Sequence, residues 1–516
     1  MVFKWRREKV DHLMADPKRA RQLIDELPVN DAKALEEITE WLESISHTPG
    51  FKVDQRFDNV SLLDAAAKQR VRKLSLDYLS MPRQMKFQEI RLWTTIFGFW
   101  QQLGVAYLAC ADQYEGGGAG LPLIRGSLPL IVARAQRALT HQVKWFLLRY
   151  GPVEPRIWKD MARLYQIADK RGFTGSSIEI SPGSRHAGSM RWEFLKAMML
   201  SVSSMDGLSP MRQEIAGRVV VHFSRMFQLS KWPDGCTHCF GLVSPKAPVR
   251  IYKGAESVTG QLFFGAGKAF AALAELMERI RRNHEVPPEV DLGGSYHLDA
   301  VMGALQHLEL CWNADPPGRS SERRLITGRI TVVPGFSDAM QALDPSTSDE
   351  LDFSQDEPAE SWIVVNVSDG GYGVIIPGLK SDWIRVGTLI GMQSEHSSRW
   401  MIGLIRRIAS DEHKQRHVGI QTLSRTAIPV RVVRAGVTGS SFNVGRAPQP
   451  AILLATAPDA QGEIGMIMRE GIFSVRDAMK KPLAASPMSF SPSGWSKAAR
   501  TLTGLRSALS SKRREW

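Results

Sequence analysis

Three residues stand out in the segment 364–378, which reads VVNVSDGGYGVIIPG. Asn366, Ser368 and Gly371 form the pattern N-x-S-x-x-G where an apolar strand runs into a glycine-rich turn. Short amide and hydroxyl side chains form hydrogen bonds at close range, and a glycine lets a ligand approach the backbone. The segment is therefore suited to holding an anion or a purine. The alternative is a plain turn on Asp369-Gly370, in which the polar side chains make local bonds.

A cluster of arginines precedes the first strand of the same region. Arg319 and Arg323 lie four residues apart in RSSER, and Arg324 follows directly. Guanidinium groups bind phosphate bidentately, stack on bases and donate to the O6/N7 edge of guanine. We expect these arginines to close over a guanine nucleotide held against the hairpin, with Arg324 or Arg329 as alternatives to Arg323. A solvated linker is the competing interpretation.

Taken together, the two motifs resemble the PilZ domain, the cyclic di-GMP receptor module of bacteria. The family pattern is R-x-x-x-R before the first strand and [D/N]-x-S-x-x-G one hairpin later, on a six-stranded barrel. The later strands RVGTLIGMQ, MIGLIRRIAS and VGIQTLS agree with it. The resemblance covers about residues 315–435. It implies that the ligand is cyclic di-GMP and that the ligand-binding residues are Arg319, Arg323, Arg324, Asn366, Ser368 and Gly371.

Helical periodicity dominates residues 1–311. In the segment 30–46, Asn30 can cap a helix that places four apolar residues on one face: Leu35, Ile38, Leu42 and Ile45. Similar patterns predict further helices over 61–80, 128–150, 191–203, 265–283 and 298–311. We expect a helical domain here, which is a candidate module for docking a protein partner.

The pattern changes after Trp312, where short apolar strands alternate with Gly, Pro and Asp turns. Residues 312–440 predict an antiparallel PilZ-like β-barrel with a solvated acidic insertion at 344–360, which holds seven carboxylates. Residues 445–480 predict a small β extension, and 481–516 predict a Ser/Pro linker with a basic tail. The expected fold class is multidomain α+β, with a mostly α-helical N-terminal region followed by the barrel and the extension.

Length, charge and cysteine usage limit the functional classes. The 516 residues exceed the size of one ordinary hydrophobic core, and the formal charge of +13 favours an anionic partner. Four cysteines are too few for a disulfide scaffold and suit a reducing cytoplasm. Cys236 and Cys239 have His222 and His238 nearby but no second ligand pair at zinc spacing. We interpret them as ordinary thiols.

The apolar stretch at 92–110 has about the length of a bilayer span, roughly 20 residues. Gln101 and Gln102 would then lie in the middle of the membrane, so a buried core helix is the better interpretation. The charged N-terminus is not followed by an apolar core, which argues against a secretory signal. We expect a cytoplasmic protein, whose basic tail is a candidate for contact with a membrane surface.

The sequence contains no complete enzyme motif. FFGAGKAF lacks the first glycine and the hydroxyl residue of a P-loop, EGGGAGLP follows a helical run, and no nucleophile is paired with a base. No recognition helix or aromatic platform supports a nucleic acid partner. The sequence predicts a cyclic di-GMP binding effector, not an enzyme, that relays the level of the second messenger to a protein partner. The alternative is a degenerate PilZ-like scaffold that binds no nucleotide.

Overall fold

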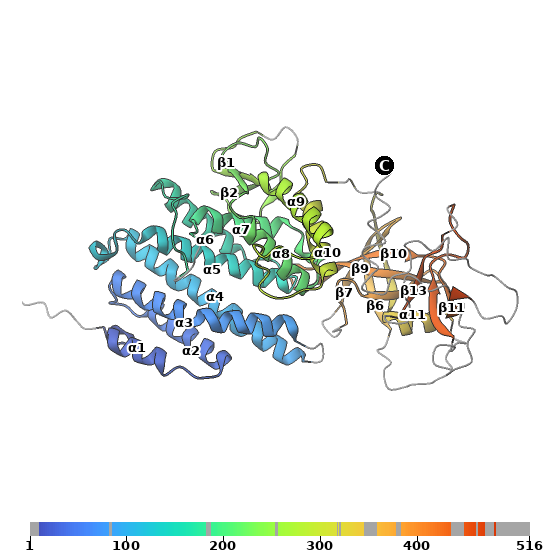
Figure 1. Ribbon diagram of the computed structural model, residues 1–516, viewed down its shortest axis with the longest axis horizontal. Helices are drawn as coiled ribbons and strands as arrows, with labels where there is room; N and C mark the ends of the chain where they lie inside the picture. The colour runs from blue at the N-terminus through green and yellow to red at the C-terminus, as the bar shows by residue number, and fades with distance from the viewer. Residues whose placement is uncertain are drawn as a thin grey trace, which may run out of the picture. The chain divides into compact units, whose positions relative to one another are not determined.

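The computed structural model describes residues 10–81, 85–181, 187–252, 256–316, 318, 321–344, 359–377, 383–434, 448–460, 463–469 and 479–480. The chain divides into two compact units, of which the first is mainly helical and the second mainly β (Figure 1). Unit 1 comprises Met1–Arg149, Val153–Met205 and Pro210–Pro316. Unit 2 comprises Tyr150–Pro152, Asp206–Ser209 and Pro317–Trp516.

Unit 1 begins with four helices: α1 (Pro17–Asp25), α2 (Asp31–His47), α3 (Val53–Ser80) and α4 (Lys86–Glu115). The Asn30 side chain caps α2 by accepting a hydrogen bond from the Lys33 N–H at 3.1 Å. A cap of this kind satisfies a backbone donor that the first turn leaves without a partner. The apolar face predicted for this helix is fully buried, at Leu35, Ile38, Leu42 and Ile45. Both the cap and the face are therefore confirmed.

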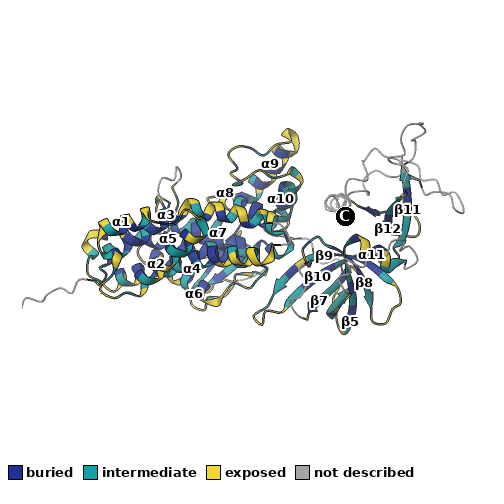
Figure 2. Ribbon diagram, turned by 90° about the horizontal axis from the view of Figure 1, so that it is seen from below, coloured by how far each residue is buried: buried dark blue, intermediate teal, exposed yellow. Residues whose placement is uncertain are grey.

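The apolar stretch 92–110 lies inside α4, whose inner side is buried against α5 (Leu128–Leu148) (Figure 2). Gln142 of α5 donates to the Trp100 carbonyl at 3.0 Å, and Gly104 leaves room for that amide. The prediction of a buried core helix is confirmed. Within the part of the chain that the structure describes, no helix has both the length and the apolar character needed to span a bilayer.

Five more helices complete unit 1, whose interior holds charged pairs, between α3 and α5 for example, as well as apolar side chains. Their bounds are α6 (Pro155–Lys170), α7 (Met190–Val202), α8 (Pro210–His222), α9 (Lys268–Asn283) and α10 (Leu298–Trp312). Arg137 donates to both carboxylate oxygens of Asp64, at 2.7 and 2.5 Å, and the Tyr107 hydroxyl donates to the same carboxylate at 2.8 Å. Buried charges of this kind are tolerated because each has a partner.

A second ionic cluster joins α5 to α8. Lys144 lies 2.5 Å from the Glu214 carboxylate, and Arg218 donates to it at 2.8 Å. Burial opposes ionisation of Glu214, but the two cations outweigh burial and lower the pKa of the carboxyl to about 2. The negative charge of Glu214 is thus a property of the folded unit.

Unit 1 also contains a small antiparallel sheet, in the order β1-β4-β2-β3, that the helical pattern of residues 1–311 did not predict. Its strands are β1 (Gln228–Ser230), β2 (His238–Gly241), β3 (Val249–Arg250) and β4 (Gln261–Gly265). Strands this short contain too few residues for alternation to be recognised. In β4, Leu262, Phe263 and Phe264 are all buried, so burial does not alternate along this strand.

Six antiparallel strands of unit 2 form a closed barrel in the order β10-β7-β6-β5-β8-β9. Their bounds are β5 (Arg324–Pro334), β6 (Glu360–Ser368), β7 (Gly371–Ile376), β8 (Leu389–Ser394), β9 (Trp400–Ser410) and β10 (Arg416–Ser424). The antiparallel barrel predicted from the sequence is confirmed. Closure leaves the six strands with no free edge, since β10 pairs with both β7 and β9.

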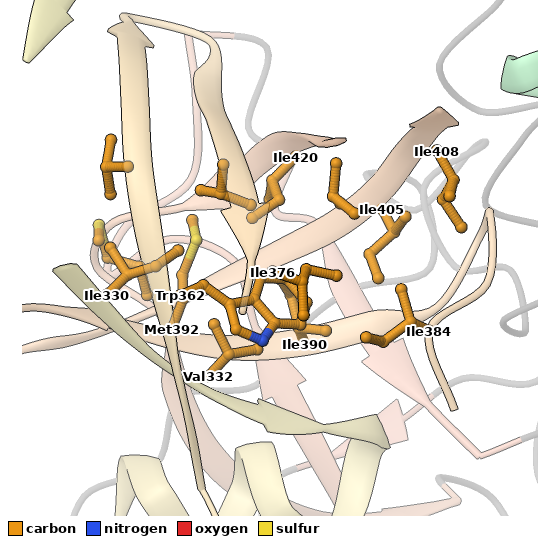
Figure 3. Packing of buried hydrophobic residues seen from close by; sticks show 14 of the residues in the cluster. Ile330, Val332, Trp362, Ile376, Ile384, Ile390, Met392, Ile405, Ile408 and Ile420 are labelled. Atoms are coloured by element: carbon orange, nitrogen blue, oxygen red, sulfur yellow. The ribbon is translucent and has the colours of Figure 1, made fainter. Parts of the chain in front are cut away.

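The barrel is filled by apolar side chains from every strand, which Figure 3 shows converging on Trp362. Trp362 is fully buried and stacks on Trp383, with ring centroids 5.5 Å apart. Glu360 accepts a hydrogen bond from each indole N–H, at 2.8 and 2.9 Å. Each large apolar side chain buried here contributes about 1.5–3 kcal/mol. The barrel interior is therefore a packed core.

Two features of unit 2 differ from the sequence prediction. A helix, α11 (Gly335–Leu343), follows β5, which the sequence analysis did not predict, and its Phe336 packs into an apolar cluster with Leu389. The strand β11 (Ile428–Arg434) falls within the range 312–440 assigned to the barrel, yet it pairs with the extension. That second sheet has the order β13-β12-β11-β14, with β12 (Gln449–Leu453), β13 (Met466–Met468) and β14 (Met479–Lys480).

Most of the predicted acidic insertion 344–360 and all of the predicted tail 481–516 lie outside the described residues.

Candidate functional site

The β6–β7 hairpin carries the N-x-S-x-x-G motif at one rim of the barrel. Asn366 and Ser368 are the seventh and ninth residues of β6, and Gly371 is the first of β7. Asp369 and Gly370 make the turn between the strands, and Ser368 and Gly371 face each other across the ladder. The hairpin therefore brings all three motif residues together within one short stretch of the barrel surface.

A β-bulge decides which way the motif faces. Val364 belongs to the barrel core, and residues at even spacing along a strand share a face. The register between β6 and β7 shifts between Val364 and Asn366, so that Val365 is an extra residue in the ladder. One extra residue reverses the faces of everything that follows it. Asn366 and Ser368 consequently lie on the outer face of the barrel and not in its core.

Gly373 supports this arrangement and was not identified from the sequence. It is the ladder partner of Asn366, and a Cβ built on it would lie 2.7 Å from both amide atoms of that side chain. The Asn366 amide therefore lies flat over β7, in the space that any other residue at 373 would fill. The sequence signal was the G-Y-G spacing in β7, since glycine within a strand often marks a close approach.

Gly371 has a structural role that its place in the motif did not reveal. A Cβ at this residue would collide with the Ile420 carbonyl oxygen, and would lie 2.9 Å from the carbonyl carbon and 3.1 Å from Gln421 Cα. These are backbone atoms of β10, which cannot move aside as the end of a side chain can. Glycine is therefore required at 371 by the packing of β7 against β10, whether or not a ligand approaches it.

The arginine segment reaches the same rim through β5. Arg324 is the first residue of β5 and is paired with Val367, one residue from each of Asn366 and Ser368. Arg323 directly precedes the strand, and both arginine side chains are exposed. Arg319 lies outside the described residues. The structure thus brings two of the three predicted arginines beside the hairpin.

Arg329, the alternative candidate, is engaged elsewhere. It pairs with Ile363 in the middle of the β5–β6 ladder. Its guanidinium donates to the Ser361 hydroxyl at 3.2 Å, and its backbone N–H donates to the Glu395 carboxylate at 3.1 Å. These contacts hold Arg329 in the middle of the ladder. Arg324 pairs with Val367 and so lies on the face opposite to Leu325 and Asn366, which favours Arg323 over Arg324 for contact with the motif.

An exposed leucine lies beside the motif. Leu325 is the ladder partner of Asn366 and is 84% exposed, and the next residue, Ile326, is 43% exposed. Residues that oppose each other directly across a ladder point to the same face of the sheet. Leu325 and Asn366 are therefore neighbours on the outer face, where an apolar side chain of this size gains nothing from the fold.

The thiols predicted to be ordinary lie in unit 1, at and just before β2. Burial raises the pKa of the Cys236 thiol to about 11, and burial, with a smaller effect of Arg250, lowers the pKa of His238 to about 4. A thiol is a good metal ligand only as the thiolate, which a raised pKa disfavours. Among the residues that the structure describes, no cluster of three or more His, Cys, Asp or Glu side chains could hold a metal ion.

A closed six-stranded barrel that presents this hairpin motif beside an arginine lead-in is the arrangement of a PilZ domain. Two family models match the chain: "Cyclic-di-GMP receptor FimW, N-terminal domain" over residues 18–234, and "Cyclic-di-GMP receptor FimW, middle PilZ domain" over residues 337–429. The chain therefore belongs to the family of PilZ-domain cyclic-di-GMP receptors. The receptors of this family bind cyclic di-GMP as their ligand. A search of curated proteins found no match.

The barrel match covers only one part of the candidate site, the hairpin, and not the arginines before it. The barrel match begins within α11 and includes Asn366, Ser368 and Gly371. It does not include β5 or the arginines before it. The hairpin is thus within the part of the chain that matches the family, and the arginine assignment depends on the geometry of the rim alone.

Proposed function

We propose that the chain senses cyclic di-GMP at the rim formed by the start of β5 and the β6–β7 hairpin. Arg323 holds a phosphate and stacks on or donates to guanine, with Arg324 and Arg319 as further cations. Asn366 and Ser368 supply short-range hydrogen bonds from the outer face. This assignment rests above all on the bulge at Val365, which turns these two side chains outward.

An apolar contact completes the proposed site. A guanine base has two wide faces that lose water when they pack against an apolar side chain. Leu325 offers such a surface directly beside Asn366, and it is more exposed than nearly every other large apolar residue described. A guanine base that covers Leu325 would remove apolar surface from water. The Asn366 amide, directly beside Leu325, could then form a hydrogen bond with the edge of the same base.

We further infer that the receptor relays the messenger to a protein partner through its helical region. The N-terminal match belongs to the same named receptor as the barrel match, so the two regions occur as parts of one functional unit. Binding would order the arginine segment, which links residues 1–311 to the barrel in sequence. Such an ordering step is a recognised way for a ligand to change the state of a second domain. The proposed location is the cytoplasm, because the low cysteine content suits a reducing compartment.

Calorimetric titration of cyclic di-GMP into the full-length protein tests the proposed site. We expect binding that Arg323→Ala, Asn366→Ala and Ser368→Ala each weaken by about tenfold or more, because each removes a hydrogen bond of roughly 1.5–3 kcal/mol to a charged or polar ligand group. Arg399→Ala is the matched control, since Arg399 is exposed in the turn between β8 and β9, which do not border the hairpin.

Each other outcome has a definite meaning. If Arg323→Ala binds cyclic di-GMP with wild-type affinity and Arg324→Ala loses affinity, the arginine that binds the ligand is Arg324. Wild-type affinity in Ser368→Ala and Asn366→Ala would remove the hairpin from the site. Absence of binding by the wild-type protein, confirmed by a second method, would favour the degenerate scaffold. Small-angle scattering with and without saturating ligand tests the relay, because an unchanged profile would contradict an ordering step.

A further inference from the structure

A third cation borders the hairpin on the side opposite to β5. Arg425 follows the end of β10, is exposed, and donates from one terminal guanidinium nitrogen to the Asp369 carbonyl oxygen at 3.2 Å. The Thr422 N–H donates to the Gly370 carbonyl at 2.9 Å, so the end of β10 is fastened to the same turn. The position of Arg425 at the hairpin is therefore set by two contacts from one strand end.

The order of strands puts cations on both flanks of the motif. β5 borders β6 on one side, and β10 borders β7 on the other. Arg323 directly precedes β5 on the first flank, and Arg425 contacts the turn from the second. Asn366 and Ser368 lie between these flanks on the outer face. A ligand placed on the motif would thus have a guanidinium group on each side.

Another arginine near β10 is less suited to this role. Arg406 of β9 donates to the Gln421 side chain at 2.7 Å and is partly buried, so it serves the pairing of β9 with β10. Arg425 differs because its contact to one carbonyl occupies a single nitrogen of a group with five N–H donors. The carboxylate of Asp369 at the same turn would repel an anion, and a cation directly beside it offsets that repulsion.

We propose, on the basis of the function proposed above, that Arg425 binds the second phosphate of the ligand. Cyclic di-GMP carries two phosphodiester groups, and each is a monoanion. Arg323, directly before β5, holds one of them, and Arg425 holds the other from the far side of the hairpin. Guanidinium suits this role because its planar fork matches two phosphate oxygens. The rim is then selective for a ligand with two phosphates over one with a single phosphate.

Two substitutions at Arg425 separate charge from geometry. Arg425→Gln removes the charge but keeps an N–H donor for the Asp369 carbonyl, and Arg425→Lys keeps both charge and donor. We measure cyclic di-GMP affinity of the full-length variants by calorimetry at several salt concentrations, with Arg399→Gln as the matched control. A thermal melt of each variant checks that the barrel is folded.

If Arg425 binds phosphate, Arg425→Gln weakens binding by about tenfold or more, and its affinity falls less steeply with salt than that of the wild type. Arg425→Lys keeps the wild-type salt dependence, and the control keeps both affinity and salt dependence. Wild-type affinity in Arg425→Gln would overturn the proposal. So would weaker binding with an unchanged salt dependence, because that result assigns Arg425 to positioning the hairpin. A wild-type protein that binds no cyclic di-GMP would instead overturn the proposed function itself.

Discussion

Replacing Gly371 by alanine tests whether this motif glycine serves the fold or the ligand. The new Cβ would collide with the Ile420 carbonyl oxygen and lie 3.1 Å from Gln421 Cα, so β7 and β10 must move apart. Overpacking of this kind costs about 1–3 kcal/mol. For a unit of roughly 200 residues, each kcal/mol lowers the melting temperature by about 2–4 °C, so we expect the barrel to melt about 2–12 °C lower.

Differential scanning calorimetry of the ligand-free protein gives this shift, and hydrogen exchange of the amides in β7 and β10 assigns it to the barrel. Gly370→Ala is the matched control, because nothing lies within 4 Å of a Cβ at that residue and its φ is not positive. We expect the control to melt like the wild type. The reasoning would be refuted if Gly371→Ala kept the wild-type melting temperature and exchange rates and lost only ligand affinity, because the glycine would then serve ligand approach.

Three further perturbations follow from the same geometry. Gly373→Ala places a methyl group in the space of the Asn366 amide, so cyclic di-GMP affinity measured by calorimetry should fall while the barrel melts nearly normally. Arg137→Met leaves the Asp64 carboxylate buried without its ion pair, and urea unfolding should show a loss of about 3–5 kcal/mol. Glu214 has a folded pKa of about 2, below its unfolded value, so its contribution is complete above that unfolded value and is lost as pH falls through the folded pKa. Lowering the pH through this range should therefore reduce the free energy of unfolding of unit 1 by about 3 kcal/mol. In Glu214→Gln, the free energy of unfolding should depend less on pH.

The sequence predicted those features that depend on local patterning. Asn30 and the apolar face of the segment after it identified α2, and alternating apolar residues identified the barrel strands. Both predictions succeed because the spacing of apolar residues within one element shows which of its faces is buried. The helix α11 was missed because its nine residues are too few for a helical period to stand out beside the strand pattern that precedes it. The bulge at Val365 was also missed, since register depends on which residue of β7 lies opposite, and a single strand does not contain that information.

The spacing N-x-S-x-x-G now has a physical explanation. Asn366 and Ser368 are two residues apart because that spacing keeps both on one face of β6, beyond the bulge. Gly371 comes three residues later because the turn brings it opposite Ser368, where β10 leaves no room for a side chain. The barrel therefore requires the glycine. Ser368 makes one long hydrogen bond inside the hairpin, to the Gly371 carbonyl at 3.5 Å, and Leu325 is exposed, so the barrel depends little on either side chain. A barrel that no longer bound nucleotide would still need Gly371 for its packing, but it could lose Ser368 and Leu325. This chain keeps both kinds of residue at one rim, which favours a receptor over a scaffold.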